Sequence, residues 1–355
     1  PTRGFFILVI LGVAVGGSLL LFALRAPMMK SEARFDLVSR EVLILGNNVL
    51  LVVAAASVFL GTLFPMVYQA ITDDLISIGP PYFNAIFVPL MILLVLLLAV
   101  GPLCRWKRTS IAYLFRQLGK VVLASLALGV LIPLVVLLEF SLAATVSVAL
   151  AAWISLSLLG DLANKTANKS SRAKALKALP LSYYGMQFAH LGAAVMLIGI
   201  GLTSAFSYEK SVLLSPGQSI DLGNYVFMFN GSTAVTGPNY VGNEADISVS
   251  KNDRPIGNLK PQRRLYLASG TPSTEMAIDA GFFRDLFVTL GEEKESGAWS
   301  MTIYVKPFIR WIWLGAIFMA FGGVIAAGDK RYRRLRKREL ERAATELSGE
   351  LQTAS

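Results

Sequence analysis

The chain holds one histidine, His190, which lies inside a long apolar stretch, SYYGMQFAHLGAAVMLIGIG at residues 182–201. An ionisable side chain at membrane depth is costly, so such residues usually face a bundle interior or a functional site. A neutral imidazole there could form an interhelical hydrogen bond, relay a proton, or ligate a metal or haem iron. The residue alone leaves these three roles open.

Small and polar residues surround this histidine on the predicted helix. Gly185 and Gly192 would let a neighbouring helix approach closely, and they would equally admit a flat macrocycle beside the imidazole. Tyr183, Tyr184 and Gln187 offer hydrogen-bond partners about one turn away. A tyrosine at the start of a span is also typical of the aromatic belt at a membrane interface.

A second group of polar residues lies in SREVLILGNN, where another apolar stretch begins. Arg40 can extend to the inner membrane surface along its aliphatic stem, whereas Asn47 and Asn48 lie deeper and either join helices or orient a bound cofactor. Tyr82, in GPPYFN at residues 79–84, lies either in an ordered re-entry loop or in the wall of an outward-facing ligand surface. We expect no direct catalyst among these residues.

A haem b commonly takes two axial imidazoles, and this chain supplies one. If His190 is an axial ligand, the second must come from another polypeptide, another subunit or a part upstream of Pro1. The single cysteine, Cys104, and the absence of a CxxC pair argue against thiol–disulfide chemistry by this chain. Because the chain opens with Pro1 and shows no signal sequence, we expect a fragment, one half of a split protein or a processed product.

The composition is that of a polytopic membrane protein. Of 355 residues, 54% are apolar and only 16% are charged, whereas soluble domains carry about 25% charged residues. Seven stretches are long and apolar enough to span a bilayer. They are residues 4–24, 43–68, 85–103, 121–138, 141–160, 183–206 and 308–327.

The charge pattern predicts how these spans are oriented. The net charge of +10 comes from short loops and a tail, namely residues 25–41, 104–120, 161–180 and 330–345, while residues 69–84 contain no lysine or arginine. This positive-inside pattern explains the excess without a nucleic-acid partner. It predicts an N-terminus outside the cytoplasm and a C-terminus inside it. Residues 26–40 and 330–345 are amphipathic and are predicted to contact the inner lipid surface.

Residues 207–306 differ from the rest of the chain. They contain nine Lys/Arg and eleven Asp/Glu, alternate apolar and polar residues, and are cut by turn signals such as Asn252-Asp253. The predicted fold is therefore a polytopic α-helical membrane protein of about seven spans with an inserted extracytoplasmic, mostly antiparallel β domain. The predicted divisions are residues 1–206 (six-span region), 207–306 (β domain), 307–328 (last transmembrane helix) and 329–355 (basic cytoplasmic tail).

Six motifs, in order, resemble the C-terminal half of the CcmF family, the haem lyase subunit of bacterial cytochrome c maturation. They are SREVLILGNNVLL, SIGPPYFN, FAHLGAAVMLIGIG, GPNYVGNEADISV, LKPQRRLY and KPFIRWIWLGAIFMAFGG. The resemblance covers essentially the whole chain. It implies a bacterial inner-membrane location, a periplasmic β domain, and His190 as an axial ligand of a structural haem b.

The resemblance also implies what this chain lacks. The family's tryptophan-rich WWD segment, its two external histidines for the haem being delivered and its other transmembrane histidine have no counterpart here, and in the family they lie upstream. The implied partners are therefore that N-terminal half, other maturation subunits (CcmH- and CcmI-like), a CcmE-like haem carrier, apocytochrome c and the lipid membrane.

The implied reaction joins haem vinyl groups to the thiols of a CxxCH segment, with quinol as a possible electron source for the haem b. His190 would tune that haem and would not act as an acid or base. A fragment alone is then expected to be inactive. Two other classes remain open from the residues: a secondary transporter, although no internal repeat is evident, and a non-catalytic scaffold for an assembly complex.

Overall fold

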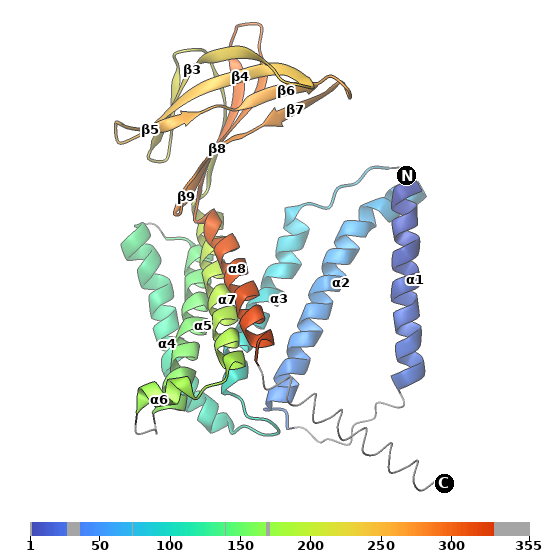
Figure 1. The fold of residues 1–355 in the computed structure, drawn as a ribbon, viewed down its shortest axis with the longest axis vertical. Helices are drawn as coiled ribbons and strands as arrows, with labels where there is room; N and C mark the ends of the chain where they lie inside the picture. Colours follow the sequence, from blue (N-terminus) through green and yellow to red (C-terminus); the bar gives the residue numbers. More distant parts are fainter. Residues whose placement is uncertain (1, 27–35, 73, 139, 168–170, 330–355) are drawn as a thin grey trace.

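The computed structural model describes residues 2–26, 36–72, 74–138, 140–167 and 171–329. Its long helices run roughly alongside one another, with α3 behind α7 and α8 in this view, and a β domain projects from one end of the α7–α8 pair (Figure 1). The helical elements are α1 (Thr2–Arg25), α2 (Arg40–Thr72), α3 (Pro80–Val100), η2 (Gly101–Leu103), α4 (Ile111–Ile132), the π-helical turn η3 (Pro133–Leu137), α5 (Leu142–Thr166), α6 (Arg172–Lys177), α7 (Leu181–Phe206) and α8 (Ile309–Ala327).

Six of these helices, α2, α3, α4, α5, α7 and α8, are long and apolar enough to cross a membrane. The first of the seven expected spans corresponds to α1, in which Val9–Arg25 forms a shorter apolar helix. Figure 1 shows α1 apart from the other helices, and its apolar side chains are largely exposed. The predicted fold class, a helical membrane protein with an inserted β domain, is confirmed.

The starts of two spans were predicted too far along the sequence. Helix α3 begins at Pro80 and not at residue 85, because prolines tolerate the first helical turn, where no intrahelical N–H bond is needed. Helix α4 begins at Ile111 and not at residue 121, with Arg116 and Lys120 in its early turns. Long basic side chains can extend from such a position to the headgroups, so they do not end the helix.

The two predicted amphipathic segments fall largely on residues 27–35 and 330–345, outside the described residues. The hairpin predicted near Glu139 also has its central residue there.

Helices α7 and α8 pack with their backbones in close contact. A Cβ on Gly192 would lie 2.6 Å from the carbonyl oxygen of Gly315, and one on Gly185 would lie 2.5 Å from that of Gly322. Only glycine permits this separation, which is typical of small-residue helix contacts in membranes. Of the two alternatives left open for Gly185 and Gly192, the structure shows the close approach of a neighbouring helix, α8.

The β domain consists of two antiparallel sheets. Its strands are β1 (Tyr208–Leu214), β2 (Ser219–Leu222), β3 (Tyr225–Thr236), β4 (Tyr240–Lys251), β5 (Arg254–Leu259), β6 (Gln262–Tyr266), β7 (Thr271–Glu275), β8 (Ala277–Ala280), β9 (Arg284–Glu293) and β10 (Trp299–Pro307). One sheet has the order β1-β10-β9-β8, and the other β2-β3-β4-β6-β7 with β5 also pairing β4. The turn predicted at Asn252-Asp253 joins β4 to β5, and both residues adopt positive φ.

Alternate side chains of both sheets form the core of this domain. Phe227 and Phe229 of β3 are fully buried against Leu286 and Val288 of β9, with further apolar side chains around them. Strand β1 follows α7 directly, and β10 leads into α8 through Phe308, which has positive φ. The hydroxyl of Thr203 in α7 donates to the carbonyl of Pro307 at 2.7 Å, so both connections of the β domain are held at one helix pair.

Candidate functional site

His190 lies in the tenth position of α7, roughly 14 Å along the helix axis from its start. Its side chain is on the flank of α7 that does not carry the glycine contacts with α8. The Nδ1 atom is buried, and neither ring nitrogen forms a hydrogen bond with a described residue. The interhelical hydrogen bond, one of the three roles open from the sequence, is therefore absent from the part of the chain that the structure describes.

The imidazole lines a hollow of about 250 Å³ between α7, α2 and the end of α3. Its walls are Arg40, Leu43, Ile44 and Asn47 of α2, Leu97 and Leu98 of α3, Gly101 and Pro102 of η2, and Met186 and His190 of α7. Residues far apart in the sequence thus form an apolar pocket with one imidazole, one amide and one guanidinium. Met186 was missed by the sequence analysis, although its position four residues before His190 places both on one helix face.

The start of α2 is held in place by the segment that follows η2. The backbone N–H of Arg40 donates to the carbonyl of Arg105 at 3.1 Å, and the Arg40 guanidinium stacks over the Trp106 ring at 5.0 Å. The carboxylate of Glu41 accepts from the backbone N–H of Lys107. Arg40 forms no ion pair with any described residue, so its positive charge remains available at the mouth of the His190 pocket.

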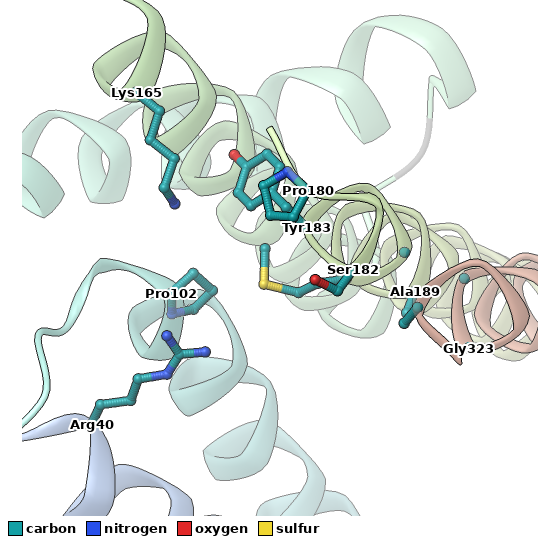
Figure 2. Close-up of a pocket in the computed structure, with 12 residues that line it drawn as sticks. Arg40, Pro102, Lys165, Pro180, Ser182, Tyr183, Ala189 and Gly323 are labelled. Carbon is teal, nitrogen blue, oxygen red and sulfur yellow. The ribbon is translucent and has the colours of Figure 1, made fainter. Parts of the chain in front are cut away.

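A second, adjoining hollow of about 400 Å³ shares Arg40, Pro102 and Met186 with the first. Figure 2 shows Arg40 from α2 and Lys165 from α5 both projecting into it, with Tyr183 of α7 on its far side. The two hollows meet at Arg40, so a flat ligand beside His190 could place polar substituents in this groove.

A hydrogen-bonded carboxylate beside this groove was not predicted. Asp161 of α5 is 6% exposed and accepts from Lys165 Nζ and from the hydroxyl of Tyr183 at 2.8 Å. Gln187 in turn donates to the Tyr183 hydroxyl. A carboxylate at the end of an apolar stretch was the available signal, and it was missed because the fifth span was ended at residue 160.

The other predicted polar residues do not join His190. Asn48 is exposed and does not line the pocket, in contrast to Asn47. The Tyr184 hydroxyl donates to the carbonyl of Leu176 at 2.8 Å and so anchors α6. Gln187 faces the Asp161 network.

Tyr82 also does not line the His190 pocket. It lies in the first turns of α3, where its hydroxyl donates to the carbonyl of Ser57 in α2 at 3.2 Å and its ring covers Gly61. Tyr82 thus joins α2 to α3, and GPPYFN forms a helix start where a loop was expected.

The donor set fits a haem better than a metal ion held by protein ligands alone. The described residues include no group of three His, Cys, Asp or Glu side chains that could hold a metal. A porphyrin supplies four of its iron's ligands itself and needs one axial imidazole from a chain such as this one. The imidazole of His190, which has no hydrogen-bond partner among the described residues, suits the iron of such a group. The apolar walls suit its ring, and the guanidinium of Arg40 suits its carboxylates.

Comparisons with known proteins give this arrangement a context. Residues 205–307 match a family model described as the CcmF C-terminal beta-sandwich. The cytochrome c-type biogenesis protein CcmF of Pseudomonas fluorescens is 47% identical over 94% of this chain and 50% of its own length. CcmF of Escherichia coli (strain K12) is 40% identical over the same shares.

A solved structure titled Cytochrome c Heme Lyase CcmF has the same fold. It aligns with a TM-score of 0.65 at 22% identity, covering 82% of this chain and 46% of that one. The chain spans about half the length of the curated relatives it matches. It is therefore homologous to CcmF-family proteins along nearly its whole length, and corresponds to a part of them that includes the C-terminal beta-sandwich.

Proposed function

We propose that this chain is part of a cytochrome c haem lyase in a bacterial inner membrane and holds a structural haem b through His190. The cytochrome c maturation role is supported by relatives that match 94% of the chain. The single observation that carries the haem role is the imidazole of His190, which lines an apolar pocket without a hydrogen-bond partner among the described residues.

The haem, when bound, would supply one-electron redox chemistry. The chain's own residues would position and tune it. His190 would donate an electron pair to the iron, and Leu43, Ile44 and Leu97 would exclude water from the ring. Arg40 would neutralise a propionate carboxylate at the pocket mouth, where its charge has no acidic partner among the described residues.

We further propose that the groove in Figure 2 admits the reductant of this haem, with quinol as its chemical class. A quinol that gives up electrons must also release protons. Lys165 and Tyr183 line the groove, and both donate to the carboxylate of Asp161. That carboxylate would accept one of the two protons by way of the Tyr183 hydroxyl, and the other would pass to bulk water. No described residue of this chain is proposed to attack the thiols or the vinyl groups, so covalent attachment depends on the remainder of the assembly.

The orientation in the membrane follows from charge. The segment at residues 104–110 and helix α6 are basic and lie at the end of the bundle opposite the β domain (Figure 1). The positive-inside rule then places the β domain and the start of α1 in the periplasm and the basic tail in the cytoplasm. This arrangement puts the β domain on the side where apocytochrome c, a haem carrier and other maturation subunits would meet.

Complementation tests the proposed function. A bacterial strain that lacks its CcmF-type protein should regain covalently haem-stained c-type cytochrome when it expresses this chain together with the remaining part of a CcmF protein. The same strain expressing this chain alone should not. Failure of the combined proteins, despite their stable presence in the membrane, would contradict the proposed role.

A further inference from the structure

Two adjacent phenylalanines lie at the membrane end of the β domain. Phe282 and Phe283 form the turn between β8 and β9, and they are 56% and 61% exposed. The turn is closed by a hydrogen bond from the backbone N–H of Gly281 to Asp285 Oδ1 at 2.9 Å. Phe227 and Phe229 of the domain core are fully buried, whereas this pair is exposed. Leu213, Leu267 and Met276 of the domain are exposed to a similar degree, so the pair is distinguished by its place beside α8.

The turn is fixed to the first residues of α8. The backbone N–H of Phe308 donates to the carbonyl of Phe283 at 2.8 Å. The Phe282 ring lies 5.7 Å from the Trp311 ring, and the Phe283 ring lies 5.9 Å from that of Phe308. On the same turn, Asp285 accepts from Arg310 Nε at 3.1 Å. The position of the phenylalanines along α8 is therefore set by a backbone bond, ring contacts and an ion pair.

The length of α8 determines the depth of this turn. Its 19 residues extend about 28 Å, which is close to the thickness of about 30 Å of the hydrocarbon core. The helix can span the bilayer only if Ile309 lies near the boundary of the hydrocarbon. Rings that contact Trp311, the third residue of the helix, must lie at this boundary as well. Aromatic side chains are favoured at that level.

We infer that the Phe282-Phe283 turn inserts into the phospholipid interface and fixes the β domain against the membrane. The occupant of this surface is the region where headgroups meet acyl chains. This assignment follows from the continuity of the turn with a membrane-spanning helix and from the exposure of both rings. The β domain would then have two attachments to the membrane, its covalent connections to α7 and α8 and this inserted turn, and its inclination would be restricted.

Depth-dependent quenching tests this inference on the full chain in lipid nanodiscs. Cys104, which is buried, is replaced by serine, and single cysteines are introduced by F282C and, as the matched control, S269C. Ser269 is exposed in the turn that joins β6 to β7. Figure 1 shows these two strands in the part of the β domain away from the helices. Both are labelled with the environment-sensitive fluorophore NBD, and lipids with a nitroxide high on the acyl chain are added.

The label at residue 282 should emit at shorter wavelength than the label at residue 269 and should be quenched by the nitroxide lipid, while the control is unaffected. Equal emission and no quenching at residue 282 would overturn the inference. Short-wavelength emission without quenching would also overturn it, because a protein surface would then cover the turn. If F282C fails to give a monodisperse protein, F283C carries the same test.

Discussion

At the residue scale, the polar groups inside the helical region differ in whether they have hydrogen-bond partners. The imidazole of His190 has none among the described residues, whereas the carboxylate of Asp161 accepts from both Lys165 and Tyr183. A buried polar group without a partner costs free energy comparable to a lost hydrogen bond. The hydrogen bonds of Asp161 contribute to the stability of the fold, whereas the imidazole of His190 is free to bind a ligand, as proposed above.

Removing the Tyr183 hydroxyl should destabilise the protein. Y183F leaves the buried Asp161 carboxylate without one of its two donors, for which we expect a loss of about 1–3 kcal/mol in the free energy of unfolding. The matched control is Y184F, which removes an exposed hydrogen bond to Leu176 that water can replace. Denaturant unfolding in detergent measures both. Equal stability of the two variants would contradict the structural role of the Asp161 network.

An ion pair between the two sheets of the β domain gives a prediction on pH. Arg263 Nη2 of β6 donates to Glu292 Oε1 of β9 at 2.9 Å and lowers the pKa of Glu292 from its ordinary value of 4.5. Because the folded-state pKa is depressed, the stabilisation is present above the ordinary pKa. It is lost as the pH falls through the lowered value.

The substitution R263Q should therefore raise the pKa of Glu292 towards 4.5. Carbon-13 NMR of the glutamate carboxyls, recorded during an acid titration, measures this value. The stability difference between the parent and R263Q should also shrink as the medium is acidified. An unchanged titration of Glu292 in the variant would show that Arg263 is not the cause of the shift.

At the element scale, the contact of α7 with α8 is made by glycines that leave no room for a methyl group. A Cβ on Gly322 would lie 2.5 Å from the backbone nitrogen of Ala189, while a Cβ on Gly323 would meet nothing within 4 Å. The neighbouring residues thus provide a matched pair on one helix. We expect G322A to destabilise the protein by about 1–3 kcal/mol, as overpacking does.

The control variant G323A should be neutral or slightly stabilising, since alanine favours a helix more than glycine does. Thermal unfolding of both variants in the same detergent tests the pair. If G322A and G323A unfold at the same temperature, the two helices are further apart than the structure places them.

The sequence predicted elements well where local chemistry determines them. Apolar stretches located six helices of spanning length, and Asn252-Asp253 located the turn between β4 and β5. The predicted helix starts were wrong where a residue type occurs both inside and outside helices. Pro80 can begin a helix or form a turn, and it begins α3. Lys120 can lie in a loop or extend its side chain from a membrane helix, and it lies within α4.

Predictions of the site were limited by long-range contacts. Arg40 and Asn47 were identified as polar residues in a span, and the structure brings both to the His190 pocket. Nothing local distinguishes Asn47 from Asn48, because the pocket is formed by α3 and α7, far away in the sequence. The sequence left the role of Gly192 open for the same reason. A small residue leaves space for either a neighbouring helix or a ligand, and the three-dimensional packing shows that α8 occupies this space.

At the scale of the whole molecule, the β domain has its own hydrophobic core, and its first and last strands are neighbours. Strands β1 and β10 pair with Tyr208 opposite Val305, so the two connections to the membrane helices lie side by side. Excision at this point leaves the buried cluster of the two sheets intact. The domain therefore meets the usual criteria for independent folding.

A polypeptide of residues 205–307 should accordingly fold without the helices. We expect a β-type circular dichroism spectrum and a single cooperative thermal transition, with F282S and F283S introduced to remove the two exposed rings of the membrane turn. A gradual transition, or a spectrum typical of an unfolded chain, would mean that α7 and α8 are required for the sandwich.

The central claim is that His190 ligates the iron of a haem b, and the visible spectrum of the assembly tests it most directly. This chain is purified with the polypeptide that carries the remaining part of a CcmF protein, and reduced-minus-oxidised spectra are recorded for the parent, H190A and the control Q187M. Gln187 is three residues away and faces the Asp161 network. We predict that H190A loses the b-type absorption and the bound haem, while Q187M retains both. An H190A assembly with the parent's spectrum and haem content would contradict the account.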